Sequence, residues 1–480
     1  MDTYGLISLI PIIIVIVVAI WTKRAAEALF VGTLCAAIIF AVGESGFSAS
    51  FLHPLAVSEA ADGTLVTVGV WSIWFNTLVD TISGSAYYIV MFGMFGALIR
   101  MLDQSGAATG FSDLGAKVIK GKKSTFFFAF ILGIIIFVDD YLNALGVGVA
   151  TRKLSDAHKG SREMLAYVTN TTGAAVCILV PFSSWAVLYM SQIKETGMFE
   201  STGFSAYTHS IPFMLYSWIA LAVTLVFIFA PKLLFGPMKK AEQRAETTGK
   251  SFPDWYYEDG ALDEIKSDKT SGWWNFAVPM LILIISGLFC AGLGVEYDIV
   301  LWLIVSVVVE AIMLMAQRKL KLSGFCDSVV NGFKDMLYVT ILVILAFALQ
   351  AFNDNLGLTP FVIEQVQPLL SAAVFPPIVF AVVALLSFAT GSFWGVAAIA
   401  FPMILPLAGA MDVNLFLAVG AVASATAFGS HVCFYSDAVT VTAAATGIKN
   451  VDYARTAIPL IAVPFVLSII AFLIFGIIMA

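Results

Sequence analysis

The chain has 480 residues, of which 60% are hydrophobic and only 12% are charged. Soluble globular chains carry about 25% charged residues, so this chain cannot surround itself with solvated groups, and a lipid bilayer is the solvent that suits it. The net charge of −7 is confined to loops, and no basic tract indicates nucleic acid as a partner. The five cysteines are scattered, which argues against a disulfide framework or a zinc site, and no cofactor is expected.

Ten apolar runs are long enough to cross a bilayer, which takes about 20 residues. They lie near residues 6–22, 26–42, 83–101, 163–193, 208–231, 273–292, 297–316, 334–352, 413–447 and 457–480. The first run lacks the basic start and the small-residue cleavage site of a signal peptide, so we predict a retained helix. The sequence therefore predicts an all-α, polytopic membrane protein.

Two further apolar runs differ from these spans in their flanking charges. Residues 125–150 have Lys and Arg on both sides, which places both ends in the cytoplasm, and Asp139-Asp140 interrupts the run. Residues 372–410 lie between loops without Lys or Arg, which places both of their ends outside. Each run is predicted to be a re-entrant hairpin. The resulting topology puts both termini on the outer side of the cell inner membrane.

The two halves of the chain have the same order of elements. We expect a first repeat over 1–235 (hairpin 125–150, broken helix 163–193), a cytoplasmic linker over 236–272, and a second repeat over 273–480 (hairpin 372–410, broken helix 413–447). An offset of about 251 residues aligns the halves, and the charge rule gives them opposite orientations. Inverted repeats with broken elements near the midplane are typical of secondary transporters.

The first polar cluster in an apolar run contains Asp139, Asp140 and Asn143. An ionised carboxylate at membrane depth is costly unless a cation, water or a proton compensates it. Two adjacent carboxylates disfavour each other's ionisation, so a proton or Na⁺ could occupy the pair. The alternative is that these residues form a cytoplasmic turn.

The second cluster lies in the broken helix of the first half. It contains Thr171, Thr172, Ser183 and Ser184. Hydroxyls beside glycine and proline suit an unwound helix whose free carbonyls coordinate a cation. The alternative is that the hydroxyls only bond back to their own helix.

The second half carries two corresponding clusters. They consist of Thr390, Ser392 and Trp394 at the tip of the hairpin, and of His431, Ser436 and Asp437 in the broken helix. The glycines around Ser392 permit a tight turn and a close backbone approach. The alternatives are a packed turn without a ligand and a histidine with a structural role.

These clusters carry a family resemblance. The runs at residues 139–143, 161–167, 180–185, 391–395, 429–431 and 436–437 resemble the NhaC family of sodium/proton antiporters. The resemblance implies inverted repeats, paired hairpins and an elevator-type movement. It also implies a central site between hairpin tips and broken helices, Na⁺ as the coupling ion, and a possible homodimer.

Two transport functions stay open. In the first, Na⁺ binds at Asp140, Thr171, Ser392 and Asp437, and Asp140 or Asp437 exchanges its proton for the ion. In the second, Na⁺ drives the transport of a small organic solute such as an amino acid or a carboxylate. Phe434-Tyr435 and Ala438 favour the second function, because the family usually has Ser-Pro and Thr there. The chain has neither a His-Glu-x-x-His pair nor a Gly-x-Ser-x-Gly elbow, so an enzyme is not expected.

Overall fold

A computed structural model describes most of the chain. The described residues are 4–22, 25–51, 53, 55, 57–59, 65–106, 119–253, 256, 272–293, 298–358, 361, 371–391, 393–434 and 436–479. Nearly all of them are helical, which confirms the all-α prediction. The strands found among them form one short antiparallel hairpin, β1 (Val57–Glu59) and β2 (Leu65–Thr67).

The first half contains eleven of the labelled α-helices of the described chain. They are α1 (Ile10–Thr22), α2 (Ala25–Ser50), α3 (Val70–Gly84), α4 (Ala86–Ser105), α6 (Lys122–Ile135), α7 (Asp140–Ala157), α8 (Arg162–Leu179), α9 (Ser184–Glu195), α10 (Gly203–Ser210), α11 (Leu215–Phe229) and α12 (Gly236–Thr248). Short 3₁₀ turns precede α1 (Gly5–Leu9) and flank α11 (Ile211–Phe213 and Pro231–Leu233).

The second half continues with helices of similar length. They are α14 (Trp274–Leu293), α15 (Ile299–Ala316), α16 (Leu322–Asn355), α18 (Phe375–Thr390), α19 (Phe393–Ala410), α20 (Leu415–Val432), α21 (Asp437–Thr446) and α22 (Asn450–Met479).

Several of these helices are suited to a bilayer by length and composition. Five described helices could each cross it alone, and four bent helix pairs could cross as broken spans, which gives up to nine spans against the ten expected. On α22, Val466, Ile470, Ile474 and Ile477 are exposed at helical spacing, as lipid-facing side chains would be. The protein is thus a multi-pass membrane protein.

Several elements differ from the sequence prediction: the predicted span 208–231, for example, is a helix pair bent by 46°. α16 begins at Leu322, twelve residues before the predicted span at 334, because its first turns contain polar residues that hydropathy does not mark. α3 was not predicted as a separate helix, and it joins α4 at a bend of 61°. α16 thus begins before its predicted apolar run, and α3 lies in a segment where no span was predicted.

The helix boundaries repeat along the chain. α7 and α8 span residues 140–157 and 162–179, and α19 and α20 span 393–410 and 415–432, so both pairs are offset by 253 residues. This offset is close to the predicted one of about 251 residues, and the inverted repeat itself stays a prediction. At the new offset, Ser183 and Ser184 match Ser436 and Asp437, and Asn143 matches Val396.

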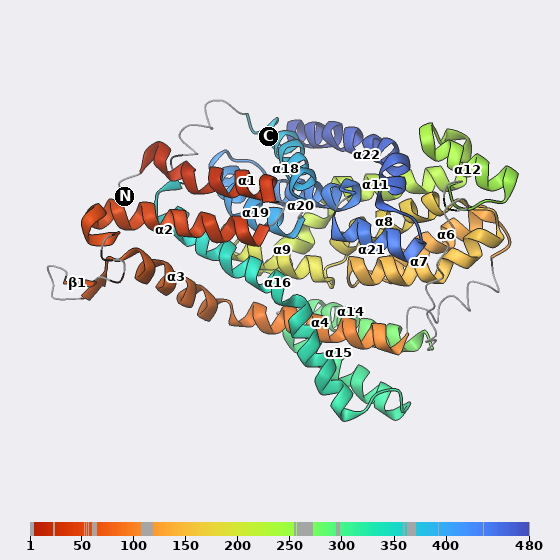
Figure 1. Ribbon diagram of the computed structural model, residues 1–480, viewed down its shortest axis with the longest axis horizontal. Helices are drawn as coiled ribbons and strands as arrows, with labels where there is room; N and C mark the ends of the chain where they lie inside the picture. Colours follow the sequence, from red (N-terminus) through yellow and green to blue (C-terminus); the bar gives the residue numbers. More distant parts are fainter. Residues whose placement is uncertain are drawn as a thin grey trace.

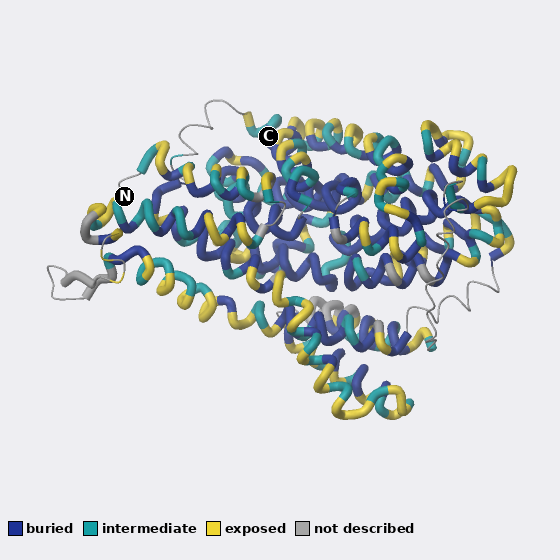
Figure 2. The backbone as a smooth tube through the Cα atoms, in the orientation of Figure 1, coloured by how far each residue is buried: buried dark blue, intermediate teal, exposed yellow. Residues whose placement is uncertain are grey.

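The helices form two groups (Figure 1). One group is a thick bundle of α6–α9 and α18–α21 with α11 and α22. The other contains α3, α4, α14 and α15 along one side, with α16 running between them and the bundle. Figure 2 shows that burial is concentrated in the bundle, whereas α3, α15 and α22 have long exposed faces.

The two halves interlock inside the bundle. α7 packs on α21, α19 packs on α9, and α8 contacts α20. The α7–α21 contact is tight, because a Cβ added at Gly148 would lie 2.7 Å from the Cβ of Ala445. The breaks of both halves are therefore held within one packed unit.

Part of the predicted linker is an ordered helix that is tied to the bundle. On α12, Arg244 Nη2 donates to both carboxylate oxygens of Glu163 at 2.9 and 3.0 Å. Glu242 on the same helix accepts from the backbone N–H of Ser161 at 2.9 Å and from its hydroxyl at 2.6 Å. These bonds join α12 to the start of α8. Most of the predicted linker beyond residue 253 lies outside the described residues.

Candidate functional site

The break between α6 and α7 is organised by Asp139. This residue is 1% exposed and caps the N-terminus of α7, because its Oδ1 accepts from the backbone N–H groups of Tyr141 at 3.0 Å and Leu142 at 3.2 Å. Its Oδ2 accepts from the Ser184 hydroxyl at 2.8 Å. Asp140 follows as the first residue of α7 and is 3% exposed. The acidic pair is therefore buried at a helix N-terminus, where donors and the helix dipole stabilise negative charge.

The break between α8 and α9 lies directly against this first break. The backbone N–H of Ser184 donates to the carbonyl of Val138 at 2.8 Å. Ser183 caps α9 by accepting from the N–H of Ala186 at 3.0 Å, and its hydroxyl also donates to the carbonyl of Cys177. The structure thus brings the predicted residues Asp139, Ser183 and Ser184 together.

Asn143 closes the first hairpin. Its side-chain amide donates to the carbonyls of Gly133 at 2.6 Å and Ile136 at 2.8 Å, which α6 leaves open at its end. Thr172 reaches the Asn143 Oδ1 at 3.4 Å but bonds more closely to the carbonyl of Thr169 within its own helix, at 2.9 Å. For Thr172 the geometry matches the alternative of back-bonding to the helix.

The tip of the second hairpin contributes aromatic rings. Trp185 at the start of α9 stacks on Phe393 with centroids 4.7 Å apart and planes at 8°, and it lies 5.1 Å from Trp394. Thr390 donates to the carbonyl of Leu386 at 2.9 Å in its own helix. Ser392 lies outside the described residues. The second hairpin therefore meets the first broken helix through stacked rings.

His431 lies at the centre of a second, fully buried polar network. Its Nε2 is 2.9 Å from the Thr171 hydroxyl and its Nδ1 is 2.8 Å from the Tyr216 hydroxyl. The carbonyl of His431 accepts from Tyr453 at 2.7 Å and from the Asn170 amide at 3.0 Å. The structure thus brings Thr171 and His431 together across the two halves. Both ring nitrogens have partners, as in a histidine with a structural role.

The break before α21 has the same cap as the break before α9. Ser436 accepts from the N–H of Val439 at 3.4 Å. Asp437 is the first residue of α21, and its side chain lies outside what the structure describes. In the part of the chain that is described, no three His, Cys, Asp or Glu side chains gather as a metal site would require.

A cavity of about 340 Å³ opens where the hairpin tips face the second group of helices. It is lined by Gly96, Ile99, Arg100, Asp139, Tyr141, Asp335, Met336, Tyr338 and Trp394. Two of these residues, Asp139 and Trp394, were predicted as site residues. The cavity therefore connects the predicted site with α4 and α16.

Arg100 and Asp335 were not predicted as site residues. The Arg100 guanidinium donates from Nε and Nη2 to the two carboxylate oxygens of Asp335, with an Nη2···Oδ1 distance of 2.7 Å. Both residues stand at the edges of the predicted spans 83–101 and 334–352, where charges are expected to be interfacial. Asp335 lies well inside the observed helix α16, and a charged residue within a membrane helix is a signal of a functional site.

Comparison with known proteins identifies the family. Residues 176–477, more than half of the chain, match the Na⁺/H⁺ antiporter family. The chain belongs to this family. Its matched region includes Ser183, Ser184, Trp394 and His431, whereas Asp139 and the rest of the first hairpin precede it.

Known relatives and solved structures resemble the whole chain. An uncharacterised protein of Haemophilus influenzae is 22% identical over 500 residues, which cover 98% of this chain and 90% of that protein. The YdaH transporter of Alcanivorax borkumensis has a similar structure, with a TM-score of 0.64, 11% identity, and 94% and 98% of the two chains covered. MtrF of Neisseria gonorrhoeae, described among antimetabolite efflux pumps, is also similar. Its TM-score is 0.58 at 12% identity, and the match covers 95% of this chain and 96% of MtrF. The fold is that of a transporter.

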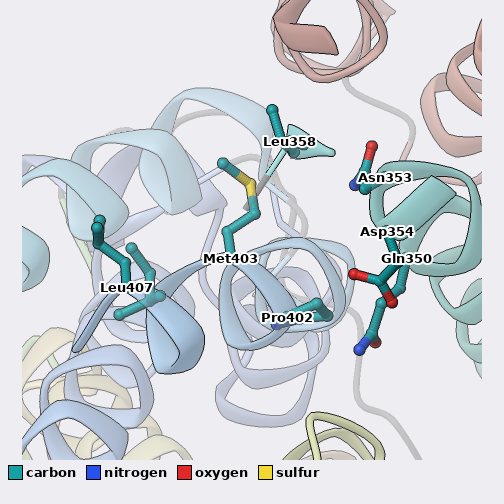
Figure 3. Close-up of a pocket in the computed structure, with 8 residues that line it drawn as sticks. Gln350, Asn353, Asp354, Leu358, Pro402, Met403 and Leu407 are labelled. Atoms are coloured by element: carbon teal, nitrogen blue, oxygen red, sulfur yellow. The ribbon is translucent and has the colours of Figure 1, made fainter. Parts of the chain in front are cut away.

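A smaller cavity of about 60 Å³ lies further along the same interface (Figure 3). Gln350, Asn353 and Asp354 of α16 form one wall, and Pro402, Met403 and Leu407 of α19 form the other. Met403 is nine residues beyond Trp394, which is about 14 Å along a helix. The surface between α16 and α19 thus contains open space at two levels.

Proposed function

We propose that this protein is a secondary active transporter that exchanges Na⁺ for H⁺, with the ions bound at the first hairpin break. The observation that carries the proposal is the buried contact between two broken elements, in which the Ser184 hydroxyl lies 2.8 Å from Asp139 Oδ2 beside the large cavity. Carboxylate and hydroxyl oxygens are hard ligands that suit a hard cation such as Na⁺. Membership of the antiporter family supports the same activity.

The exchange would follow from competition for one carboxylate. In this proposal Asp140, next to the capping Asp139, binds either a proton or Na⁺, and Thr171, Ser392 and Asp437 are the further predicted ligands. An acidic residue inside the membrane is costly while it is ionised and uncompensated. A translocation step with an empty, charged site is therefore disfavoured, which couples the two ions.

We further infer that the two halves have opposite orientations and that the bundle moves. The re-entrant hairpins α6–α7 and α18–α19 would travel with the broken helices, because their interlocked contacts make one packed unit. The other group is held rigidly, since a Cβ added at Gly96 on α4 would lie 2.2 Å from the carbonyl oxygen of Gly332 on α16. The cavities between α16 and α19 support a sliding surface there.

Flux measurements test the proposal. Full-length protein is reconstituted into liposomes that contain a pH-sensitive dye, and NaCl or KCl is added outside. We expect NaCl alone to raise the internal pH, and we expect Asp140→Asn to abolish the response while the protein stays monodisperse in detergent. Wild-type protein without a sodium-specific response, or Asp140→Asn with an unchanged one, would contradict the proposal.

Asp412→Asn is a matched control for this experiment. Asp412 is an exposed carboxylate at a turn, with φ of 53°, a conformation that asparagine also tolerates. Removing its charge should leave Na⁺-dependent flux unchanged.

A second candidate function is Na⁺-coupled transport of a small organic solute. The size of the large cavity favours it, because sites for small molecules have volumes of about 300–1,000 Å³ whereas an ion needs far less. Substrate-dependent Na⁺ uptake into the same liposomes would distinguish it from simple exchange. Several further properties stay predictions: Na⁺ as the coupling ion, the absence of a cofactor, the inner-membrane location, both termini outside and a homodimer. Light scattering of the detergent-solubilised protein tests the last of these.

A further inference from the structure

The large cavity has a charged wall on the side of α4 and α16. Arg100 and Asp335 form their bidentate pair there, and their side chains are 42% and 38% exposed. Both charged groups are therefore accessible from the cavity. Charged residues within membrane helices are rare and mark substrate or ion pathways.

The pair is not needed to hold α4 and α16 together. These helices already meet through Gly96 and Gly332, whose backbones are in close contact. A partly exposed ion pair adds little to stability. A purely structural role therefore does not explain why the Arg100–Asp335 pair is charged or why it faces the cavity.

Three aromatic residues also line the cavity. Trp394 comes from the second hairpin, Tyr141 from the start of α7, and Tyr338, which is 46% exposed, lies three residues after Asp335 on α16. Aromatic faces bind apolar groups and cations. The cavity thus offers one cation, the carboxylates of Asp335 and Asp139, and an aromatic surface within a single space.

We propose that this cavity binds an α-amino acid, with Arg100 taking its carboxylate and Asp335 its ammonium group, while its apolar side chain lies against Trp394 and Tyr338. The proposal rests on the second candidate function, Na⁺-coupled transport of an organic solute, and names the class of that solute. The planar guanidinium suits a carboxylate, whereas Na⁺ binds only oxygen ligands and would give Arg100 no role.

Thermal stability and flux of the full-length protein test this inference together. The purified protein is heated in NaCl with each of the proteinogenic L-amino acids, and the strongest stabiliser is compared with its amine and acid analogues, which lack the carboxylate or the ammonium group. We expect one or more amino acids with an apolar side chain to raise the Tm, and neither analogue to do so at the same concentration. An acid analogue that acts as well as the amino acid would overturn the role of Asp335, and an equally effective amine would overturn that of Arg100.

The flux assay separates the two proposals. Sodium-dependent pH changes without stabilisation by any amino acid would overturn this inference and leave Na⁺/H⁺ exchange standing. Absence of both would overturn both. Stabilisation together with sodium-dependent uptake of the same radiolabelled amino acid would support the inference and favour solute transport.

Charge reversal distinguishes recognition from a structural ion pair. We expect Arg100→Gln and Asp335→Asn each to weaken amino-acid binding about tenfold or more. The double variant Arg100→Asp/Asp335→Arg restores an ion pair but exchanges its ends, so binding should not recover while the protein stays monodisperse. Recovery of binding in the double variant would show that only the pairing matters.

Asp156→Asn is the matched control. The Asp156 carboxylate is 37% exposed, close to the 38% of Asp335, and it is likewise paired with an arginine, Arg162. Unlike Asp335, it lies outside the cavity. Its removal should leave the affinity for the amino acid unchanged.

Discussion

The two hairpins have the same backbone plan but close it by different means. In the first, α6 ends with open carbonyls at Gly133 and Ile136, and the Asn143 side chain donates to both. In the second, α18 ends at Gly391 in the left-handed conformation, with φ of 66°, and its N–H donates to the carbonyl of Ser387. Val396, buried at 1%, stands at the position that corresponds to Asn143.

The difference shows how two helix pairs with the same boundaries can carry different side-chain chemistry at their tips. A glycine that ends its helix by its own backbone needs no polar side chain nearby, so the second tip is free to present Phe393 and Trp394. The first tip needs polar groups, and these lie beside Asp139 and Ser184. The hydrogen-bonding side chains that close the turn therefore lie in the first hairpin, and stacked aromatic rings lie at the tip of the second.

The strongest test converts the first hairpin to the chemistry of the second. Asn143→Val leaves two buried carbonyls without their donor, and we expect it to lower the free energy of unfolding by about 3 kcal/mol. The Tm in detergent measures the change. Asn76→Val, at an exposed asparagine of α3, is the control and should have little effect. An unchanged Tm for Asn143→Val would show that the two hairpins close alike.

The paired caps give a comparison of intermediate size. Ser436→Ala removes one cap bond, and we expect a loss of about 1 kcal/mol. Ser183→Ala also removes the bond to the carbonyl of Cys177, so a loss of about 2 kcal/mol is expected. Thermal unfolding of the two single variants measures the difference. Equal losses would contradict the extra role assigned to Ser183.

The smallest effect is expected at the glycine that ends α18. Gly391→Ala places a Cβ in a left-handed conformation and should cost about 1 kcal/mol. Gly84→Ala is the matched control, because this last residue of α3 has open space around it and alanine favours the helix. If both variants unfold at the same temperature, the left-handed turn is not what closes the second hairpin.

Sequence reasoning found most elements because the bilayer imposes simple rules. Hydropathy marked the long helices. The positive charges on both sides of residues 125–150 predicted a re-entrant hairpin there; the structure has two helices with a break, α6 and α7, and their re-entrant placement stays a prediction. The partners of His431 could not be found in this way, since Tyr216 is 215 residues away and is one of many aromatic residues in apolar runs. The same holds for Arg100 and Asp335, which are 235 residues apart and meet only because two glycines let α4 and α16 touch.

The contact between Gly148 and Ala445 has a consequence for the evolution of the chain. The two residues belong to different halves, and the space between α7 and α21 has no room for another methyl group. A larger residue at one position can be accepted only when the other side gives way. Residues from the two halves are therefore bound to change in concert at this interface, and a larger side chain on one helix requires a compensating change on the other.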